Sequence, residues 1–478
     1  MINAGDTAWV LACTALVMLM TPGLAFFYGG MVRAKSVLNM LMLNFIALAV
    51  VSVLWVGYGF SLSFGDDAFG GLVGGLDHAG LADTWGRLAG FAASTADPPV
   101  PWPGPDAVPV LAFVMFQLMF AIITPALISG AVADRTRFWP WVLFVALWVT
   151  LVYFPVAHWV FSFDGFLGES AAGGWIANEL KALDFAGGTA VHINAGAAGL
   201  ALAIVLGRRR GWPREPMRPH NVPLVLLGAS LLWFGWFGFN AGSALSAGDL
   251  AAVAFTNTTV ATAAAVLGWL AAEQVRDGRP TTLGAASGAV AGLVAITPAC
   301  GFVSPLGAIA IGAVAGAVCS LAVRLKYRLR LDDSLDVVAV HLVGGLVGTL
   351  LVGLFATTAV NPLGADGLFY GGGLAVLGRQ SVAAFAVLGY SFVVTLLIGL
   401  AIKHTIGLRV DAEAEVAGID EAEHAESGYE LSGLLRGGHG SGAGAGAGSG
   451  SGSGSGQGGY QARPPARVPA TAGKAKEG

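Results

Sequence analysis

The chain has few charged residues for its length. Only 11% of its 478 residues are Asp, Glu, Lys or Arg, whereas 55% are hydrophobic. A soluble globular domain carries about a quarter charged residues, so this composition excludes a protein whose whole surface faces water. The hydrocarbon of a lipid bilayer is the solvent that accepts such a surface. We therefore expect an integral membrane protein.

Cysteine pairs and catalytic signatures are also missing. Cys13, Cys300 and Cys319 lie in apolar stretches without paired spacing, which predicts neither a disulfide framework nor a metal site. The sequence has no nucleotide-binding glycine loop and no nucleophile–base spacing. We expect no enzyme, no cofactor and no nucleic-acid partner. The first apolar run has no basic region before it and no clear cleavage site, so we expect it to be retained as a helix.

What the sequence does contain is long apolar runs. A helix needs about 20 apolar residues to cross a hydrocarbon core of ~30 Å, and we find eleven runs of this kind. Because the backbone in lipid must satisfy its hydrogen bonds within each segment, we expect helices. The abundant Gly and Ala let such helices pack closely. The expected spans are 7–30, 37–62, 109–132, 138–160, 188–207, 222–243, 250–273, 281–299, 305–325, 336–357 and 381–404.

Lys and Arg are distributed unevenly among the connecting loops. Fifteen of them follow odd-numbered spans, as in "GRRRGWPREPMRPHN" and "RLKYRLR", whereas the other loops hold only Arg87, Lys181 and Arg379. Cytoplasmic loops carry the excess of positive charge. We therefore expect the N-terminus outside, the C-terminus in the cytoplasm, and a multi-pass protein of the inner (plasma) membrane.

The pattern of spans indicates an internal repeat. Five spans form an odd-numbered unit, so a second copy would be inserted upside down, and we expect two inverted five-helix repeats plus one extra helix. Thr124-Pro125 and Thr297-Pro298 occupy equivalent spans in this scheme, as do "DFAGGTAVH" and "DVVAVH". Inverted repeats place their site near the bilayer midplane, between the two halves.

The residues after the last span differ in composition from the rest. We divide the chain into a transmembrane domain at 1–404, an acidic cytoplasmic tail at 405–436, and an extension at 437–478. The tail has scattered apolar residues that suit docking on the cytoplasmic loops. The extension is Gly/Ser-rich and then Pro/Ala-rich, which is typical of disordered chain.

Two histidines lie inside apolar spans at matching places, His192 in 188–207 and His341 in 336–357. A single such histidine is most often a satisfied core residue, but an ionisable group inside a membrane is costly and usually faces a cavity or a partner. We expect the two rings to meet near the centre. Neutral imidazole has one donor and one acceptor, so the pair would offer a polar rail to a small neutral guest in a pore that rejects ions.

Two aspartates precede these histidines, Asp184 and Asp336. An Asp near a helix start is most often a cap, and the Gly-Gly-Thr after Asp184 favours a cap or a structural brace. A direct role as a cation ligand remains the alternative.

Aromatic residues gather at the outer ends of several spans. These residues include Phe116, Phe120, Trp159, Phe161, Trp236 and Phe239. A belt of rings at the membrane interface explains many of them. It explains less well why the run "WFGWFGFNAGS" ends at Ser243, because a hydroxyl beside rings suits a wet vestibule that attracts a small cation by cation–π contact.

These residues together resemble the ammonium transporter family (Amt/Mep/Rh), in its bacterial Amt-type form. The resemblance lies in "DFAGGTAVHINAG", "WFGFNAGSA", "GAVAGLVAITPACG", "DDSLDVVAVHLVGG" and "GLRV" with the acidic tail. It runs from the first span to about Tyr429 and leaves out the Gly/Ser extension.

The resemblance implies a homotrimer with one pore in each subunit. It implies that ammonium is recruited at an outer site, passes a phenylalanine gate, is deprotonated, and continues as ammonia past twin histidines. The resemblance makes methylammonium a further candidate substrate, which the sequence does not decide. In bacterial members a PII-type signal protein can plug the cytoplasmic mouth and use the C-terminal tail, and residues 405–429 are compatible with that. By the matching motifs, the twin histidines are His192 and His341, and the gate is Phe120 with Phe239. The residue that lines the pore below the gate is Trp236. The outer site consists of Phe161, Trp159, Ser243 and Asp184.

One position departs from the family pattern. Many members have Trp where this chain has Phe161. Because Phe attracts a cation more weakly than Trp, we expect a weaker outer site here.

Two other functions stay open at this point, a channel for a neutral solute such as water or carbon dioxide, and an ammonium sensor that signals through its tail. The sequence does not decide whether the proton follows the ammonia.

Overall fold

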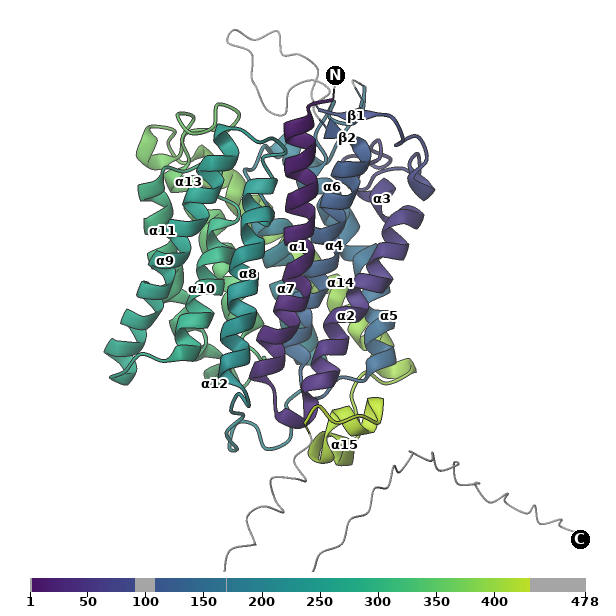
Figure 1. Cartoon of the computed structure of the whole chain (residues 1–478), viewed down its shortest axis with the longest axis vertical. Helices are drawn as coiled ribbons and strands as arrows, with labels where there is room; N and C mark the ends of the chain where they lie inside the picture. The colour runs from purple at the N-terminus through teal and green to yellow at the C-terminus, as the bar shows by residue number, and fades with distance from the viewer. Residues whose placement is uncertain (1, 91–107, 169, 430–478) are drawn as a thin grey trace, which may run out of the picture. The chain divides into compact units, whose positions relative to one another are not determined.

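The computed structural model describes residues 2–90, 108–168 and 170–429. The contacts within the chain gather residues 1–429 into one unit and leave residues 430–478 as a second. The expected extension at 437–478, and the part of the tail from 430 to 436, therefore lie outside the described residues. The described part is helical apart from turns, isolated bridges and one short antiparallel pair, β1 (Leu88–Ala89) with β2 (Val108–Pro109) (Figure 1).

Ten helical segments in the described ranges are long and apolar enough to cross a membrane. This agrees with an all-helical, multi-pass membrane protein, and each of the eleven expected spans overlaps a helix. The expected span at 281–299 is shorter than the rest, since α10 (Thr282–Ile296) has 15 residues and ends before Pro298, which lacks the N–H needed to continue the ladder. The ten longer segments are Ala4–Met31, Ala34–Phe64, Val110–Val132, Phe138–Phe161, Gly188–Leu206, Val222–Gly242, Asp249–Asp277, Pro305–Leu329, Val338–Phe355 and Ala375–Thr405.

Several of these segments are divided by π-helical turns or followed by short helices. The uninterrupted long helices are α1 (Ala4–Met31), α4 (Val110–Val132), α8 (Val222–Gly242), α9 (Asp249–Asp277) and α14 (Ala375–Thr405). The divided or extended ones are η1 (Ala34–Ser36), α2 (Val37–Leu54), η2 (Trp55–Gly59) and α3 (Phe60–Phe64); α5 (Phe138–Trp148), η4 (Val149–Tyr153) and α6 (Phe154–Phe161); η6 (Gly188–Ile193) and α7 (Asn194–Leu206); α11 (Pro305–Ala322) and α12 (Leu325–Leu329); η7 (Val338–Val343) and α13 (Gly344–Phe355). Short helices in the connections are η3 (Ala79–Leu81), η5 (Ile176–Leu180) and η8 (Leu368–Tyr370). Those in the tail are α15 (Ala412–Ala417) and η9 (Asp420–His424).

Small residues bring neighbouring helices into close contact. Gly312 and Gly316 on α11 lie one turn apart and face α9, where a Cβ on either would come within about 2 Å of the Ala261 or Ala265 carbonyl oxygen. Helices in lipid associate through such close van der Waals packing, because no hydrophobic effect drives them together. The abundance of glycine in the spans therefore serves packing.

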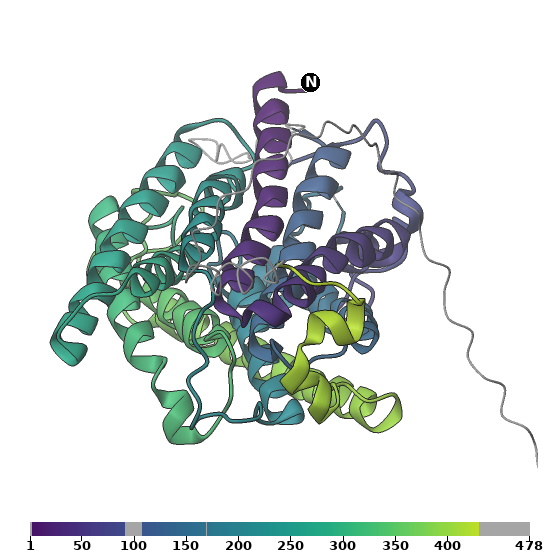
Figure 2. The same cartoon turned by 60° about the horizontal axis from the view of Figure 1, so that its bottom comes forward.

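The tail docks on the ends of α2 and α5 through its carboxylates. Asp420 accepts hydrogen bonds from the backbone N–H groups of Leu38 (3.0 Å) and Asn39 (2.8 Å), and Glu423 accepts one from Phe138 (2.9 Å). The residues preceding α2 and α5 supply no side-chain cap of their own. A carboxylate at a helix N-terminus satisfies free N–H groups and complements the helix dipole. The acidic residues of this segment therefore cap helix ends. Figure 2, in which the bottom of Figure 1 comes forward, shows the yellow-green tail over the ends of the purple and blue helices.

A buried ionic network lies beside the docked tail. Arg209 bonds both Asp332 (2.8 Å) and Asp134 (3.0 Å), and Arg135 lies 3.8 Å from Asp332, with all four side chains nearly inaccessible. Burial opposes ionisation of Asp332, but hydrogen bonding and charge from Arg209, with Arg135 nearby, hold its pKa below the ordinary value. Removal of one member would leave an unpaired buried charge, which costs about 3–5 kcal/mol.

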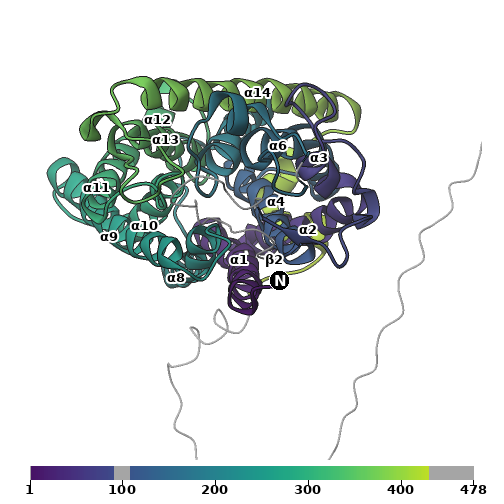
Figure 3. The same cartoon turned by 90° about the horizontal axis from the view of Figure 1, so that it is seen from above.

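The last helix, α14, runs along one side of the bundle (Figure 3) and contacts both α7 and α13. Its polar side chains point inward to specific partners. Thr395 accepts a hydrogen bond from the Trp148 indole at 2.8 Å, and Ser391 donates one to the Asn194 carbonyl at 2.8 Å. This helix therefore braces segments from both halves of the chain.

Candidate functional site

A cavity of about 470 Å³ lies among residues from several helix ends and their connecting loops. These helix ends, such as the start of α4 and the end of α6, lie at the end of the bundle opposite α15 in Figure 1. Phe161, Asp184 and Ser243, all proposed from sequence for an outer site, contribute to its wall. Aromatic rings dominate the rest of the lining, with a few neutral polar groups. These other lining residues include Phe113, Phe116, Phe120, Phe163, Phe166, Phe185, Phe302, Gln117, Asn178 and Asn361.

Trp159, the remaining candidate for the outer site, is directed elsewhere. Its indole N–H donates to the Leu72 carbonyl at 2.8 Å, and its ring packs against Tyr390 (4.8 Å) and Trp175 (5.9 Å). It is not among the described residues that line the cavity. Since Phe161 is two residues away on the same helix, the two side chains point to different sides, and only Phe161 reaches the cavity.

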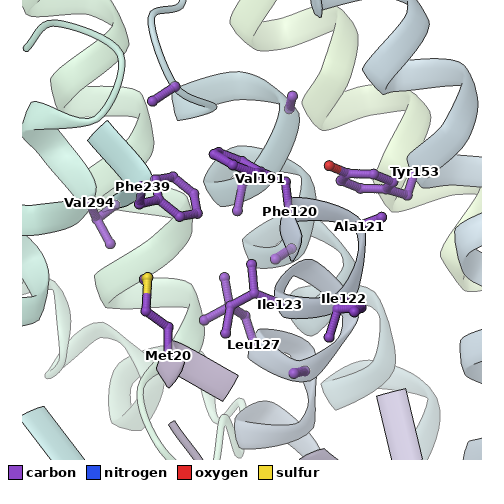
Figure 4. Close-up of a cluster of buried hydrophobic side chains, with 14 of the residues drawn as sticks. Met20, Phe120, Ala121, Ile122, Ile123, Leu127, Tyr153, Val191, Phe239 and Val294 are labelled. Atoms are coloured by element: carbon purple, nitrogen blue, oxygen red, sulfur yellow. The ribbon is translucent and has the colours of Figure 1, made fainter. Parts of the chain in front are cut away.

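The rings of Phe120 and Phe239 lie against each other below this cavity. Their centroids are 4.2 Å apart, and both side chains are almost fully buried. Phe120 lines the large cavity, whereas Phe239 lines a second, much smaller one. The pair therefore forms the partition between the two spaces. Figure 4 shows both rings above Met20 and Leu127, which line the smaller space.

The second cavity has a volume of about 10 Å³. A space of about 10–15 Å³ holds one water-sized molecule. Its wall is apolar except for His192, His341 and Trp236, and the Trp236 indole N–H is already used in a 2.9 Å hydrogen bond to Thr297 Oγ1. The two histidines are thus the polar groups left for a guest. The other lining residues are Met20, Leu24, Ile123, Leu127, Val191, Leu232, Phe239 and Val290.

His192 and His341 face each other through like nitrogens. Their Nδ1 atoms are 3.4 Å apart, their ring centroids 5.4 Å apart, and both rings are buried. Since a hydrogen bond between two Nδ1 atoms needs one donor and one acceptor, one ring carries its proton on Nδ1 and the other on Nε2. His192 Nε2 has no hydrogen-bond partner among the described residues. The pair can therefore both donate to and accept from a small molecule.

The same local geometry places each histidine. Each lies in a π-helical turn, η6 or η7, eight residues after an aspartate that caps that turn. Asp184 accepts from the N–H groups of Gly188 (2.7 Å) and Thr189 (2.8 Å). Asp333 accepts from those of Val337 (3.1 Å) and Val338 (2.7 Å). π-Turns inserted into helices occur frequently at functional sites.

The aspartate that matches Asp184 is therefore Asp333 and not Asp336, which the sequence motif had paired with it. Asp336 stands five residues before its histidine, where the first half has Gly187, and both residues adopt positive φ, +64° and +115°. The Asp336 carboxylate instead forms an ion pair with Lys326 at 2.6 Å. The expected match was wrong because it counted the nearest Asp and not the residue that the turn geometry requires.

A glycine four residues after each histidine lets the two segments approach. A Cβ on Gly196 would lie 2.4 Å from the Leu342 backbone nitrogen, and one on Gly345 would lie 3.2 Å from His192 Cβ. Any side chain on Gly196 would therefore push against the backbone of the opposite half. The contact between the two rings depends on these glycines.

The Asp184 carboxylate is fully engaged by its own turn. It receives hydrogen bonds from the N–H groups of Gly187, Gly188, Thr189 and Ala190 and from the Thr189 hydroxyl. Burial raises the pKa of this carboxyl above its ordinary value, although the hydrogen bonds from Thr189 and the glycines oppose the shift. This geometry favours the cap over the cation ligand as the role of Asp184.

Two residues of this region escaped the sequence reasoning. Gln380 on α14 is fully buried and pairs with both backbone groups of Leu183, accepting at 2.6 Å and donating at 2.7 Å, which fixes the residue before Asp184. Lys181 lines the large cavity. Gln380 lies 197 residues from Leu183 in the sequence, and no local sequence pattern predicts a contact over that separation. Lys181 had been counted only as a loop cation.

The chain is similar to known transport proteins over most of its length. Residues 8–429 match the family model described as the Ammonium Transporter Family. The ammonium transporter of Mycobacterium tuberculosis is 62% identical over 442 residues, which cover 90% of this chain and 91% of that protein. The crystal structure of Saccharomyces cerevisiae Mep2 superimposes with a TM-score of 0.76 at 36% identity, covering 86% of this chain and 88% of that one. A structure described as a Sensor Amt Protein gives 0.77 at 29% identity, covering 88% and 98%.

Proposed function

Since the chain belongs to the ammonium transporter family, we propose that it conducts ammonia derived from ammonium through the two cavities described above. Ammonium enters the large cavity, where aromatic rings and the Ser243 hydroxyl hold it. It passes between Phe120 and Phe239 and continues past His192 and His341. The observation that carries the proposal is the pair of facing imidazoles in a space for one small molecule, separated from the larger cavity by two rings.

The apolar wall of the inner cavity decides which species passes. An ammonium ion transferred whole into an apolar space loses its hydration, at an effective cost of several kcal/mol after relaxation. Neutral ammonia loses far less and can both donate to and accept from the histidines. An N–H bond of ammonium therefore breaks before the inner cavity, and the released proton goes to water in the large cavity. Trp236, stacked on His192 at 5.4 Å, holds that ring in place.

The inverted arrangement of the two halves accounts for the meeting of the rings. The matched Asp-to-His offsets and the Thr-Pro pairs support two five-helix repeats inserted in opposite directions, with α14 as the additional helix. In this arrangement the large cavity opens to the outside and the docked tail lies in the cytoplasm. The excess of Lys and Arg on the tail side supports the same orientation and an inner-membrane location.

Assembly and regulation follow from the family. We propose a homotrimer with one pore per subunit, which light scattering of the detergent-solubilised protein would measure. A PII-type signal protein is the proposed partner at the cytoplasmic mouth, beside the regulatory tail at 405–429. We propose the same domain limits as from the sequence, a transmembrane transporter domain at 1–404, a regulatory tail at 405–436 and an extension at 437–478.

The test is transport by the purified protein in liposomes. After an ammonium pulse, an internal pH dye should report faster alkalinisation than in protein-free liposomes, because entering ammonia takes up a proton inside. Phe239→Trp should slow the response by narrowing the partition. Phe237→Trp is the matched control, since Phe237 packs on Phe255 at 3.9 Å and lines neither cavity.

The same liposomes separate the other functions. A neutral-solute channel would speed osmotic shrinkage in stopped-flow light scattering while leaving the ammonium response at the protein-free level. A sensor would give neither response. The sensor is the less favoured of the two, because the Mycobacterium tuberculosis relative at 62% identity is named a transporter, whereas the sensor structure is 29% identical.

A further inference from the structure

We propose that Lys181 sets the affinity of the large cavity for cations by opposing their entry, an inference that rests on the ammonium-recruiting role proposed above. Lys181 lines that cavity together with Asp164 and Asp184. These three are the charged side chains among the described residues of the lining. A fixed positive charge at the entrance of a cation pathway lowers the occupancy of the cavity by cations, so its presence needs an explanation.

The position of Lys181 is fixed by its backbone. It ends η5 in the left-handed region, at φ 55° and ψ 43°, and its N–H bonds the Ile176 carbonyl. Two residues later, Gln380 holds both backbone groups of Leu183. The ammonium group therefore moves only within the reach of its own side chain, over the wall of the cavity.

Lys181 is exposed, and no ion pair or hydrogen bond of its side chain occurs among the described residues. The carboxylate of Asp184 is taken up by its turn. Asp164 uses Oδ1 to accept from the Gly173 N–H at 2.7 Å. The lysine charge is thus not consumed in a structural pair, and its field acts on whatever enters the cavity.

The expected effect follows from Coulomb's law in a wet cavity. At separations of about 6–10 Å and a dielectric constant near that of water, as in a wet cavity, removing one unit charge changes monovalent cation affinity by roughly 2–5-fold. A divalent cation experiences twice the repulsion, so its factor is the square of that value. Lys181 therefore weakens ammonium binding modestly and weakens competition by Mg²⁺ more strongly.

The experiment measures the apparent ammonium affinity of transport in liposomes at low and high ionic strength. Lys181→Met, which removes the charge and keeps most of the length of the side chain, should lower the half-saturating ammonium concentration about 2–5-fold at low ionic strength, and the difference should shrink in high salt. Lys181→Arg should resemble the wild type. Inhibition by Mg²⁺ should strengthen in Lys181→Met by about the square of the ammonium factor.

Two further variants make the test reciprocal. Asp164→Asn, which still accepts the Gly173 hydrogen bond, should raise the half-saturating concentration, and the double variant should return towards the wild-type value. Arg379→Met removes a cation from the same predicted outer side but outside the cavity lining, and should change nothing. An unchanged affinity in Lys181→Met, or an equal change in Arg379→Met, would overturn the proposal. Absence of ammonium transport in the wild type would instead overturn the proposed function.

Discussion

At the scale of single residues, the two imidazoles gain their properties from what surrounds them. The His192 ring lies against the rings of both Trp236 and His341, each at a centroid distance of 5.4 Å, and these contacts restrict its rotation. The space beside the rings is otherwise apolar. Placing a charge there costs several kcal/mol, whereas hydrogen bonding of a neutral guest to the free His192 Nε2 relieves a buried unsatisfied nitrogen, which costs about 1–3 kcal/mol. These two magnitudes favour a neutral guest.

The proposed path past the histidines gives a test of whether transport carries charge. Under an ammonium pulse on a solid-supported membrane, a proton relay through the rings gives a transient current, and passage of ammonia alone gives none. We expect His192→Ala to abolish any current while leaving ammonia passage measurable with the pH dye, because removing the ring widens the space and interrupts the relay. A current of wild-type size in His192→Ala would exclude the relay.

The outer aromatic position gives a second prediction at this scale. Phe161→Trp should lower the half-saturating ammonium concentration about 2–5-fold, because a cation–π contact with Trp gains about 0.5–1 kcal/mol at an exposed site. Trp159→Phe is the control, since the Trp159 ring is turned to Tyr390 and Leu72 and should not affect affinity. Unchanged affinity in Phe161→Trp would count against a cation site at this ring.

At the scale of elements, one local design occurs twice. An aspartate caps a π-turn, a residue of positive φ follows three positions later, the histidine comes after eight, and a glycine after twelve. When the two stretches are aligned on these positions, "DFAGGTAVHINAG" and "DSLDVVAVHLVGG" share the first Asp, the His and the final Gly, and they form the same structural unit. Because each unit supplies one ring and the glycine that admits the other unit, neither half could form the site alone.

The close approach of these units can be tested at Gly196. Gly196→Ala places a methyl group 2.4 Å from the Leu342 nitrogen, so the backbones must separate. We expect a loss of about 1–3 kcal/mol of stability, seen as a lower unfolding temperature, together with slower ammonia passage. Gly389→Ala on α14 is the matched control, since a Cβ there has no neighbour within 4 Å. Equal transport by both variants would show that ring spacing is not critical.

The whole molecule shows which parts of the structure were predictable. Each of the eleven spans expected from hydropathy overlaps a helix, because the backbone of an apolar run in lipid must satisfy its hydrogen bonds within the segment. The matching positions of His192 and His341 in their spans predicted that the two rings meet, and their Nδ1 atoms lie 3.4 Å apart. The choice between Phe161 and Trp159 needed the rotation of α6, and that between Asp333 and Asp336 needed the backbone angles. The Gln380 clamp and the capping by the tail join residues far apart in sequence, which no local pattern indicates.

The docked tail ties the last described residues to the first helices. Its carboxylates supply the caps that these membrane helices lack. On docking, they exchange hydrogen bonds with water for hydrogen bonds with the backbone N–H groups at two helix N-termini. His424 adds a hydrogen bond from its ring to Asn39 at 3.0 Å, and Tyr429 one to His220 at 2.7 Å. Each contact contributes little alone, and the tail is held by their sum.

Asp420 is the most direct test of this capping. Loss of a cap costs about 1 kcal/mol, which raises the undocked population about fivefold. Where opening is fast relative to cleavage, proteolysis follows that population, so Asp420→Ala should be cut within 406–429 about five times faster than the wild type. Asp420→Asn, which still accepts hydrogen bonds but lacks the charge, should fall between them. Glu413→Ala is the control, because Glu413 is exposed and makes no contact of its own with the helix ends. If Asp420→Ala were cut no faster than Glu413→Ala, the apolar contacts of Ile419, which is fully buried, would hold the tail, and the acidic composition would serve another purpose.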